Sequence, residues 1–250
     1  MRRILRFFLR AVLGVLIGLT LYEAIMFVRV YRLRSNNPSS TSLIDIRASE
    51  AKEKGQQVRR EQIWVPLDKI STNLQRAVLA GEDTNFTTHR GFDYEAIRNA
   101  WDQAQKETAR EAKQEGEDDD WLPSLPEFKR GGSTISQQLA KNLYLSSQRS
   151  FLRKGQEAAL TVMLERSLTK RRILEIYLNV IEWGDGVYGA EAASRRYFRK
   201  PASALNANEA AFLSAMIPNP RTVFNPQTNP RRVARRQRII MRGMPYVKLP

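Results

Sequence analysis

Residues 131–145 (GGSTISQQLAKNLYL) combine features that suit a phosphate or diphosphate group. Two glycines permit a sharp turn, and Thr134 with Gln137 has capping-box spacing, which predicts a helix start. Gln138 and Lys141 follow on the same helical face as Thr134. Free N–H groups at a helix start, with a lysine in reach, can bind phosphate. A capped surface helix with a solvated lysine gives the same pattern, and no Gly-Lys-Ser/Thr closes a nucleotide P-loop.

Two glutamates occupy positions from which a carboxylate could act on a substrate. We expect one helix from a Ser71 cap to about Glu82, and another that begins near Gln156 with Glu157 in its first turn. Each glutamate continues an apolar stripe of two aliphatic residues: Leu74 and Val78 for Glu82, Leu160 and Leu164 for Glu157. A carboxylate within hydrogen-bond reach of a hydroxyl is a sufficient general base. For Glu82 taken alone, a helix-end salt bridge is the alternative.

Three segments, read together, resemble the peptidoglycan glycosyltransferase family: residues 77–93 (AVLAGEDTNFTTHRGFD), 131–145 and 153–190 (RKGQEAALTVMLERSLTKRRILEIYLNVIEWGDGVYGA). The resemblance covers roughly residues 60–222 and is closest to the monofunctional, membrane-anchored biosynthetic transglycosylases. It implies a mostly α, lysozyme-like glycosyltransferase domain. We found no alternating pattern long enough to predict a strand.

The resemblance also implies a reaction. Glu82, in EDTNFTTHRG, matches the family's general base, which deprotonates the 4-hydroxyl of the acceptor N-acetylglucosamine. That oxygen attacks C1 of the muramyl sugar at the end of the lipid-linked growing strand. A β-1,4 bond forms with inversion and undecaprenyl diphosphate leaves. Lipid II and the lipid-linked glycan strand are therefore the expected substrates, and phosphoglycolipid inhibitors of the moenomycin type mimic the donor.

The remaining site residues are carried over by motif. Those expected to contact donor phosphates or shape the donor site are Lys141, Arg149, Arg153, Lys154, Gln138, Ser133 and Thr134. Glu157 matches the family's second essential acid, which either orients the donor or holds a divalent ion near the phosphates. The sequence requires no cofactor. If Glu157 holds a divalent ion, that ion would be Mg²⁺ or Mn²⁺. Asp83 and the single histidine, His89, are expected to make structural hydrogen bonds, because no metal-ligand set accompanies them.

Charge and composition restrict the partners. The chain has 250 residues, a formal net charge of +15 and no cysteine. The positive charge favours an anionic partner, such as a membrane surface, a phosphorylated substrate or nucleic acid. We find no nucleic-acid recognition motif, so no nucleic-acid partner is expected. The lack of cysteine excludes disulfides and thiol catalysis.

The N-terminal region contains an apolar run at residues 11–28, which as a helix spans about 27 Å. A transmembrane anchor is the main interpretation. A cleaved signal peptide lacks a convincing small-x-small site, and an interfacial helix lacks a polar face. Arginines flank the run on both sides, so charge does not fix the topology. The resemblance implies a single pass through the bacterial cytoplasmic (inner) membrane, with the catalytic domain on the extracytoplasmic side.

The chain is thus expected to divide into an anchor with flanking basic residues (1–34), a polar linker (35–62), a glycosyltransferase domain (63–222) with a mobile charged insertion (102–129), and a basic C-terminal segment (223–250). Further helices are expected after an Asp93 cap, at 170–180, after an Asn208 cap, and in the basic tail. We interpret the basic tail helix as a solvated or lipid-facing surface.

Two rival functions come from other classes. A lytic glycosidase would also use a helix-end glutamate, but it needs neither a phosphate site nor an anchor. A non-enzymatic membrane scaffold is disfavoured by the presence of both glutamates and Lys141. Other cell-wall synthesis or division proteins remain a further class of expected partner.

Overall fold

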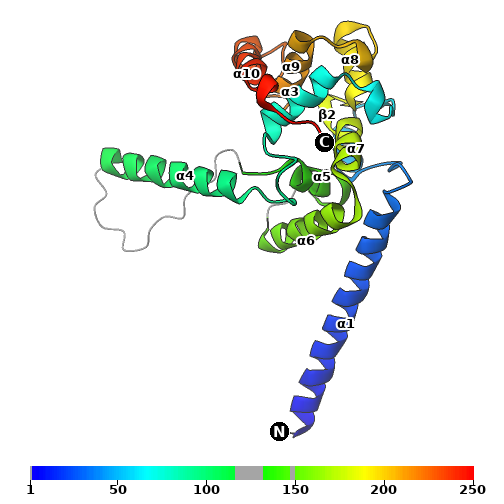
Figure 1. Cartoon of the computed structure of the whole chain (residues 1–250). Coiled ribbons are helices and arrows are strands. Elements are labelled where there is room, and N and C mark those ends of the chain that lie inside the picture. The colour runs from blue at the N-terminus through cyan, green and yellow to red at the C-terminus, as the bar shows by residue number, and fades with distance from the viewer. Residues whose placement is uncertain (1, 116–131, 147–149) are drawn as a thin grey trace.

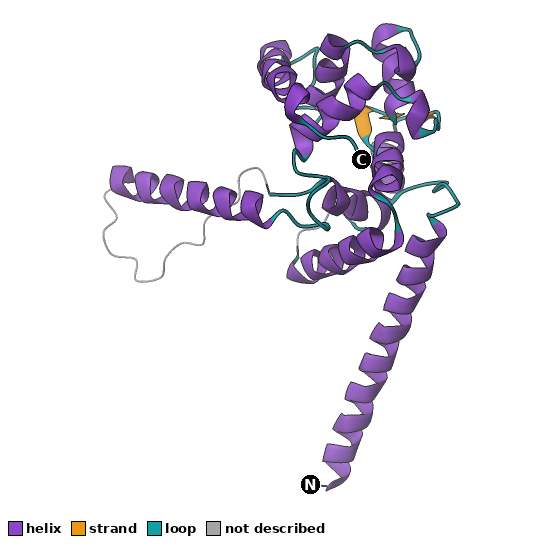
Figure 2. Cartoon of the chain, in the orientation of Figure 1, coloured by secondary structure: helices purple, strands orange, loops and turns teal. Residues whose placement is uncertain are grey.

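The computed structural model describes residues 2–115, 132–146 and 150–250, and these are mostly helical, as the sequence predicts (Figure 2). The α-helices of the described residues are α1 (Arg2–Arg32), α2 (Ser42–Glu53), α3 (Thr72–Glu82), α4 (Tyr94–Glu115), α5 (Ile135–Tyr144), α6 (Phe151–Ser167), α7 (Lys170–Val180), α8 (Ala190–Phe198), α9 (Ala207–Met216) and α10 (Pro230–Gly243). Short 3-10 helices lie at η1 (Leu67–Lys69), η2 (Ala202–Ala204) and η3 (Met244–Tyr246).

One small sheet also forms, from strands β1 (Glu61–Gln62), β2 (Glu182–Gly184) and β3 (Val187–Tyr188) in the order β1-β3-β2. β1 pairs with β3 in parallel, and β2 pairs with β3 antiparallel. The sequence did not predict these strands, because segments of two or three residues are too short to show alternation.

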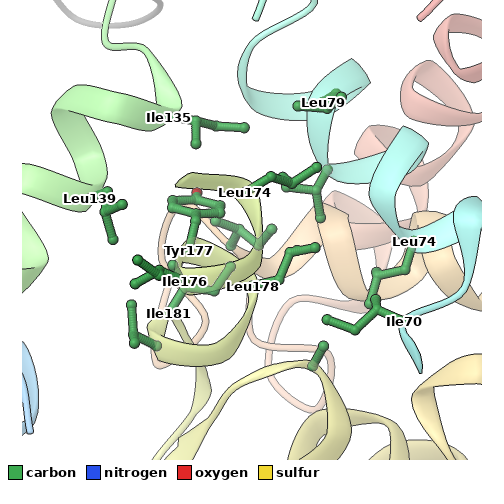
Figure 3. Close-up of a cluster of buried hydrophobic side chains, with 14 of the residues drawn as sticks. Ile70, Leu74, Leu79, Ile135, Leu139, Leu174, Ile176, Tyr177, Leu178 and Ile181 are labelled. Carbon is green, nitrogen blue, oxygen red and sulfur yellow. The ribbon is translucent and has the colours of Figure 1, made fainter. Parts of the chain in front are cut away.

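Helix α7 forms the centre of the folded body. Its sequence, KRRILEIYLNV, is apolar on most of its surface after the first turn, and Leu174, Tyr177 and Leu178 are completely buried. Figure 3 shows these side chains between residues of α5 on one side and α3 on the other: Ile135, Leu139, Leu74 and Leu79. The ends of α3 and α5, where the predicted site residues lie, are therefore held against a common core.

Two groups of helices pack around this centre (Figure 1). Helices α3, α9 and α10 contact one another, while α5 contacts α6 and α7. Glu82 belongs to the first group, and Lys141 and Glu157 belong to the second. The candidate site therefore forms between the two groups.

Helix α1 extends away from the body (Figure 1) and is long and apolar enough to cross a membrane. Most of it is exposed, but Met26, Val30 and Leu33 near its C-terminal end are buried, and the helix contacts α6. Two hydrogen bonds secure the junction: Arg34 Nε donates to the Ser167 carbonyl at 2.6 Å, and Arg172 Nε donates to the Leu33 carbonyl at 2.8 Å. The end of α1 is thus part of the folded domain.

The range expected to be a polar linker contains the packed helix α2 and strand β1. Thr41 caps α2, Ile44 is buried, and the helix contacts α5. Arg47 donates from Nε and Nη2 to Glu182 Oε2 at 3.1 and 3.0 Å. Helix α2 is held by one buried isoleucine and by an ion pair with a residue that is distant in the sequence. Its own sequence therefore gives little indication that it packs against the domain.

Several predicted helix boundaries are correct. Ser71 caps α3, which ends at Glu82, and Thr134 with Gln137 forms a capping box at α5. The prediction for residues 170–180 matches α7.

Two predicted helix starts are wrong. Helix α6 begins at Phe151 with a Ser150 cap, so Glu157 lies in its second turn. The cap of α9 is Asn206, not Asn208, because Glu209 at the third helical position completes a capping box with Asn206.

The expected charged insertion is described only in part. Asp93 accepts a hydrogen bond from the Ala96 N–H, as expected of a cap, and α4 then continues to Glu115. Residues 102–115 are therefore helical, which suits their many alanine, glutamate, lysine and arginine residues. The rest of the insertion, 116–129, lies outside the described residues.

Candidate functional site

Glu82 is the last residue of α3, and its side chain is only 8% exposed. Its Oε2 accepts a hydrogen bond from Gln138 Nε2 at 2.9 Å, and its Oε1 accepts one from Arg236 Nη2 at 2.7 Å. Burial raises the pKa of Glu82, while the charge of Arg236 and the hydrogen bond from Gln138 act in the opposite direction. The result is a buried carboxylate with one cationic and one neutral donor.

Gln138 is itself fixed by the core. The Tyr177 hydroxyl donates to Gln138 Oε1 at 2.8 Å, so the amide nitrogen must face Glu82. Tyr177 is completely buried on α7, and burial raises its pKa, so the phenol remains a donor at neutral pH. A chain of hydrogen bonds therefore runs from the core to the candidate base. The sequence placed Gln138 among the donor-site residues but did not predict its contact with Glu82.

Asp83 and His89 connect the end of α3 to the start of α5. Asp83 Oδ2 accepts from the Ile135 N–H at 2.9 Å, and its Oδ1 lies 2.8 Å from His89 Nε2. Because the Gly91 N–H donates to His89 Nδ1, the ring proton sits on Nε2 and is donated to Asp83. The expected structural hydrogen bonds of these two residues are confirmed.

Three N–H groups that were expected to be free for a phosphate at the start of α5 have partners in the structure. The Ile135 N–H donates to Asp83, the Thr134 N–H donates to the Gln137 side chain, and the Gln137 N–H donates to Thr134. The Asp83 carboxylate at this helix end also opposes a second anion. Thr134 is buried and its hydroxyl donates to the Gly91 carbonyl, whereas Ser133 is exposed.

A second carboxylate, Glu157, is held by two cations. Arg153 Nη1 donates to Oε2 at 2.8 Å, and Lys154 Nζ donates to Oε1 at 2.5 Å. The Glu157 side chain is 5% exposed, whereas that of Lys154 is 55% exposed. Lys141 pairs with no carboxylate in the described part of the chain. Its side chain is exposed to water, yet desolvation by the surrounding protein lowers its pKa, and the charge of Glu157 acts in the opposite direction. Arg149 lies outside the described residues.

Two hollows meet between these groups. The lysine pocket, of about 410 Å³, is bordered by Lys141 and Arg153 and extends to Arg47 and Arg221. The glutamate pocket, of about 500 Å³, is bordered by residues of α3, α10 and the start of α5: Glu82, Asn85, Ser133, Thr134 and Arg236. Gln138 and Pro218 border both. A ligand that fills both pockets therefore contacts the buried carboxylate of Glu82 in the glutamate pocket and several cationic side chains in the lysine pocket.

No metal-binding cluster of three or more histidine or acidic residues occurs among the residues that the structure describes. Both oxygens of Glu157, the residue for which a divalent ion was considered, are bonded to cationic side chains. A metal at this position would lie beside two cations, and it would need further oxygen ligands from phosphate.

Arg236 is the site residue that the sequence interpretation missed. The sequence predicts a solvated or lipid-facing surface for the basic tail helix, yet α10 packs against α3 and its Arg236 bonds to Glu82. A usable signal was present: Val233 and Ile240, the two buried residues of α10, lie three residues before and four residues after Arg236. Arg236 therefore shares their helical face, which turns towards the body.

Comparison with known sequences identifies the family of this chain. A family described as "Transglycosylase" matches residues 49–116 and 122–245, and the chain belongs to that family. A relative from Laribacter hongkongensis is 43% identical over 98% of this chain and 100% of its own length. One from Aromatoleum aromaticum is 46% identical over 96% of each chain, and one from Chromobacterium violaceum is 45% identical over 92% of each.

All three of these relatives are named biosynthetic peptidoglycan transglycosylases. The predicted family is thereby confirmed, and with it the mostly α, lysozyme-like fold and the single N-terminal apolar helix.

Proposed function

We propose that this protein polymerises peptidoglycan glycan strands from lipid II, with Glu82 as the general base. Its membership of the transglycosylase family and the names of its relatives support the activity. One observation carries the assignment of the site: a buried carboxylate borders one pocket, and Lys141 and Arg153 border the pocket that adjoins it at Gln138.

In this proposal Glu82 takes the proton of the acceptor's 4-hydroxyl as its oxygen attacks C1 of the donor's muramyl sugar. The C1–oxygen bond to the diphosphate breaks, and a β-1,4 bond forms with inversion. Lys141, Arg153 and Lys154 offset the charge that develops on the leaving diphosphate. Arg149 has the same proposed role on the basis of its motif.

Other residues have supporting roles. Gln138 holds the base and borders both pockets, so it can also contact the sugar between them. Ser133 is exposed at the glutamate pocket and available to a substrate, whereas Thr134 shapes the pocket through its cap. Glu157 orients Arg153 and Lys154 through its two ion pairs.

The proposal includes a membrane location. Helix α1 would cross the bacterial inner membrane once, with the domain on the extracytoplasmic side, where lipid II is consumed. The catalytic domain would include α2 and α10 as well as residues 63–222, since both helices border the pockets and the family match reaches residue 245. Other cell-wall synthesis or division proteins are proposed partners.

The test is direct. Purified full-length protein in detergent is incubated with lipid II, and the products are separated by size. Polymer that grows with time supports the proposal, whereas absence of polymer contradicts it. Shortening of added glycan strands would instead support a lytic glycosidase.

A further inference from the structure

Arg236 makes a set of contacts that a surface arginine would lack. Its Nη2 donates to Glu82 Oε1 at 2.7 Å and to the Gly81 carbonyl at 2.8 Å. Its guanidinium carbon lies 5.4 Å from the centre of the Phe224 ring, within the range of a cation–π contact. The side chain is 26% exposed and is held on three sides.

We infer that Arg236 is a positioning residue for catalysis, which fixes the orientation of the Glu82 carboxylate and keeps it ionised inside the protein. This inference rests on the proposed function, in which Glu82 is the base.

The orientation follows from the contacts at both oxygens. Arg236 holds Oε1, and Gln138, itself held by Tyr177, holds Oε2. Rotation of the carboxylate would break both hydrogen bonds. A carboxylate has about four lone-pair positions, so one donor at each oxygen leaves a lone pair for the acceptor hydroxyl. The two contacts therefore aim the base without blocking it.

A cation is needed because the site is buried. Burial raises the pKa of Glu82, and a protonated carboxyl group cannot act as a base. Arginine suits this role because its guanidinium does not give up a proton in proteins, so it stabilises the anion without neutralising it.

The other charged groups around Glu82 do not replace Arg236. Asp83, which directly follows α3, raises the pKa of Glu82 further. Lys141 of α5 attracts the charge of Glu82 but makes no ion pair with it in the part of the chain that the structure describes. Tyr177 of α7 is neutral. Helix α9 packs along α3, but its Glu209 pairs with Lys200, and Tyr246 of η3 is exposed to solvent.

The experiment is a pH–rate profile of kcat/KM for lipid II polymerisation by the full-length protein. Arg236→Gln, Arg236→Lys and the parent are compared with Arg238→Gln, which removes an exposed charge from the same helix. For Arg236→Gln we expect the acid limb to move up by about 1 to 3 pH units, so that activity lost at low pH returns at high pH. Arg236→Lys should shift less, and Arg238→Gln should match the parent.

A purely structural role would look different. If Arg236 only attaches α10 to α3, its loss should lower activity by the same factor at every pH, and an unchanged acid limb would overturn the inference. If Arg236→Gln does not fold, as judged by thermal unfolding, then Arg236→Met, which keeps most of the side chain's length without its charge, decides: a limb at the parent's position counts against the inference, and an upward shift supports it.

Glu82→Gln in the same series separates the two proposals. If Glu82→Gln retains activity, the base assignment fails whatever Arg236 does. If Glu82→Gln is inactive while Arg236→Gln keeps the parent's acid limb, only the inference about Arg236 fails.

Discussion

The surroundings of Glu82 and of Glu157 differ in a way that separates two kinds of buried carboxylate. Both side chains are less than a tenth exposed. Glu157 sits within α6 and binds two cations from that same helix, Arg153 and Lys154. Glu82 ends its helix and is held from α10 and α5 by one cation and one amide.

The difference lies in the groups that bind each carboxylate. Glu157 is held by two ion pairs within its own helix, and its effect is to hold two cations in place beside the lysine pocket. Glu82 is hydrogen-bonded to one cation, Arg236, and burial raises its pKa, which leaves it able to accept a proton. We therefore expect substitutions of the two glutamates to change different measurements.

The largest effect is expected for Glu82→Gln. The amide has nearly the same shape but cannot take a proton, so the rate of lipid II polymerisation should fall by about 10²- to 10⁴-fold. Glu53→Gln, at an exposed position on α2, serves as the matched control. More than about a tenth of the parent's activity in Glu82→Gln would contradict a loss of this size and remove the contrast with Glu157.

Lys141→Ala should act on donor affinity. A charge-assisted hydrogen bond is worth about 1.5 to 3 kcal/mol, or about a 10- to 150-fold loss of affinity for a moenomycin-type donor mimic. Lys52→Ala, an exposed lysine in the last turn of α2, is the control. In Glu82→Gln the same affinity should change little, because Glu82 borders the other pocket. Unchanged affinity in Lys141→Ala would place the donor phosphates elsewhere.

Glu157→Gln should affect stability more than Glu82→Gln does. It removes the partner of two cations, one of them with a side chain only 18% exposed. We expect a loss of about 1 to 2 kcal/mol in unfolding free energy, less than for a fully buried pair because Lys154 reaches water. Denaturant unfolding of both variants measures it, and equal stabilities would mean that the two carboxylates are held alike.

The smallest effect is a pH dependence of stability. Burial raises the pKa of Glu82 above its ordinary 4.5, so the folded state binds this proton more tightly than the unfolded state. The associated stability is present below pH 4.5 and is lost as the pH rises through the folded-state pKa. Glu82→Gln should therefore gain stability relative to the parent between acidic and neutral pH. Thermal unfolding of both proteins at acidic and at neutral pH tests this prediction. A loss of stability in Glu82→Gln relative to the parent as the pH rises would contradict a raised pKa for Glu82.

The sequence predicted what depends on neighbouring residues. Caps and apolar spacing predicted α3, α5 and α7 to within a residue or so, and with them the inward position of Glu82. Family motifs predicted which residues should line the site, and the structure brings Glu82, Gln138 and Lys141 to adjoining pockets.

What the sequence could not show depends on contacts between distant segments. The Ile135 N–H at the start of α5 looked free because its partner, Asp83, follows another helix, far away in the sequence. Helix α2 looked like a linker because Arg47 finds its carboxylate at Glu182. Arg236 was one of many arginines in a polar helix until the fold placed it beside Glu82.

The junction between α1 and α6 has a mechanical consequence. Because Val30 and Leu33 are buried in the core and Arg172 is bonded to the end of the helix, we expect the proposed anchor and the domain to move as one body. A membrane helix adjusts to a thicker or thinner bilayer partly by tilting. Any such tilt would turn the lysine and glutamate pockets through the same angle. Bilayer thickness would then set the orientation in which the two pockets meet a substrate whose lipid tail stays in the membrane.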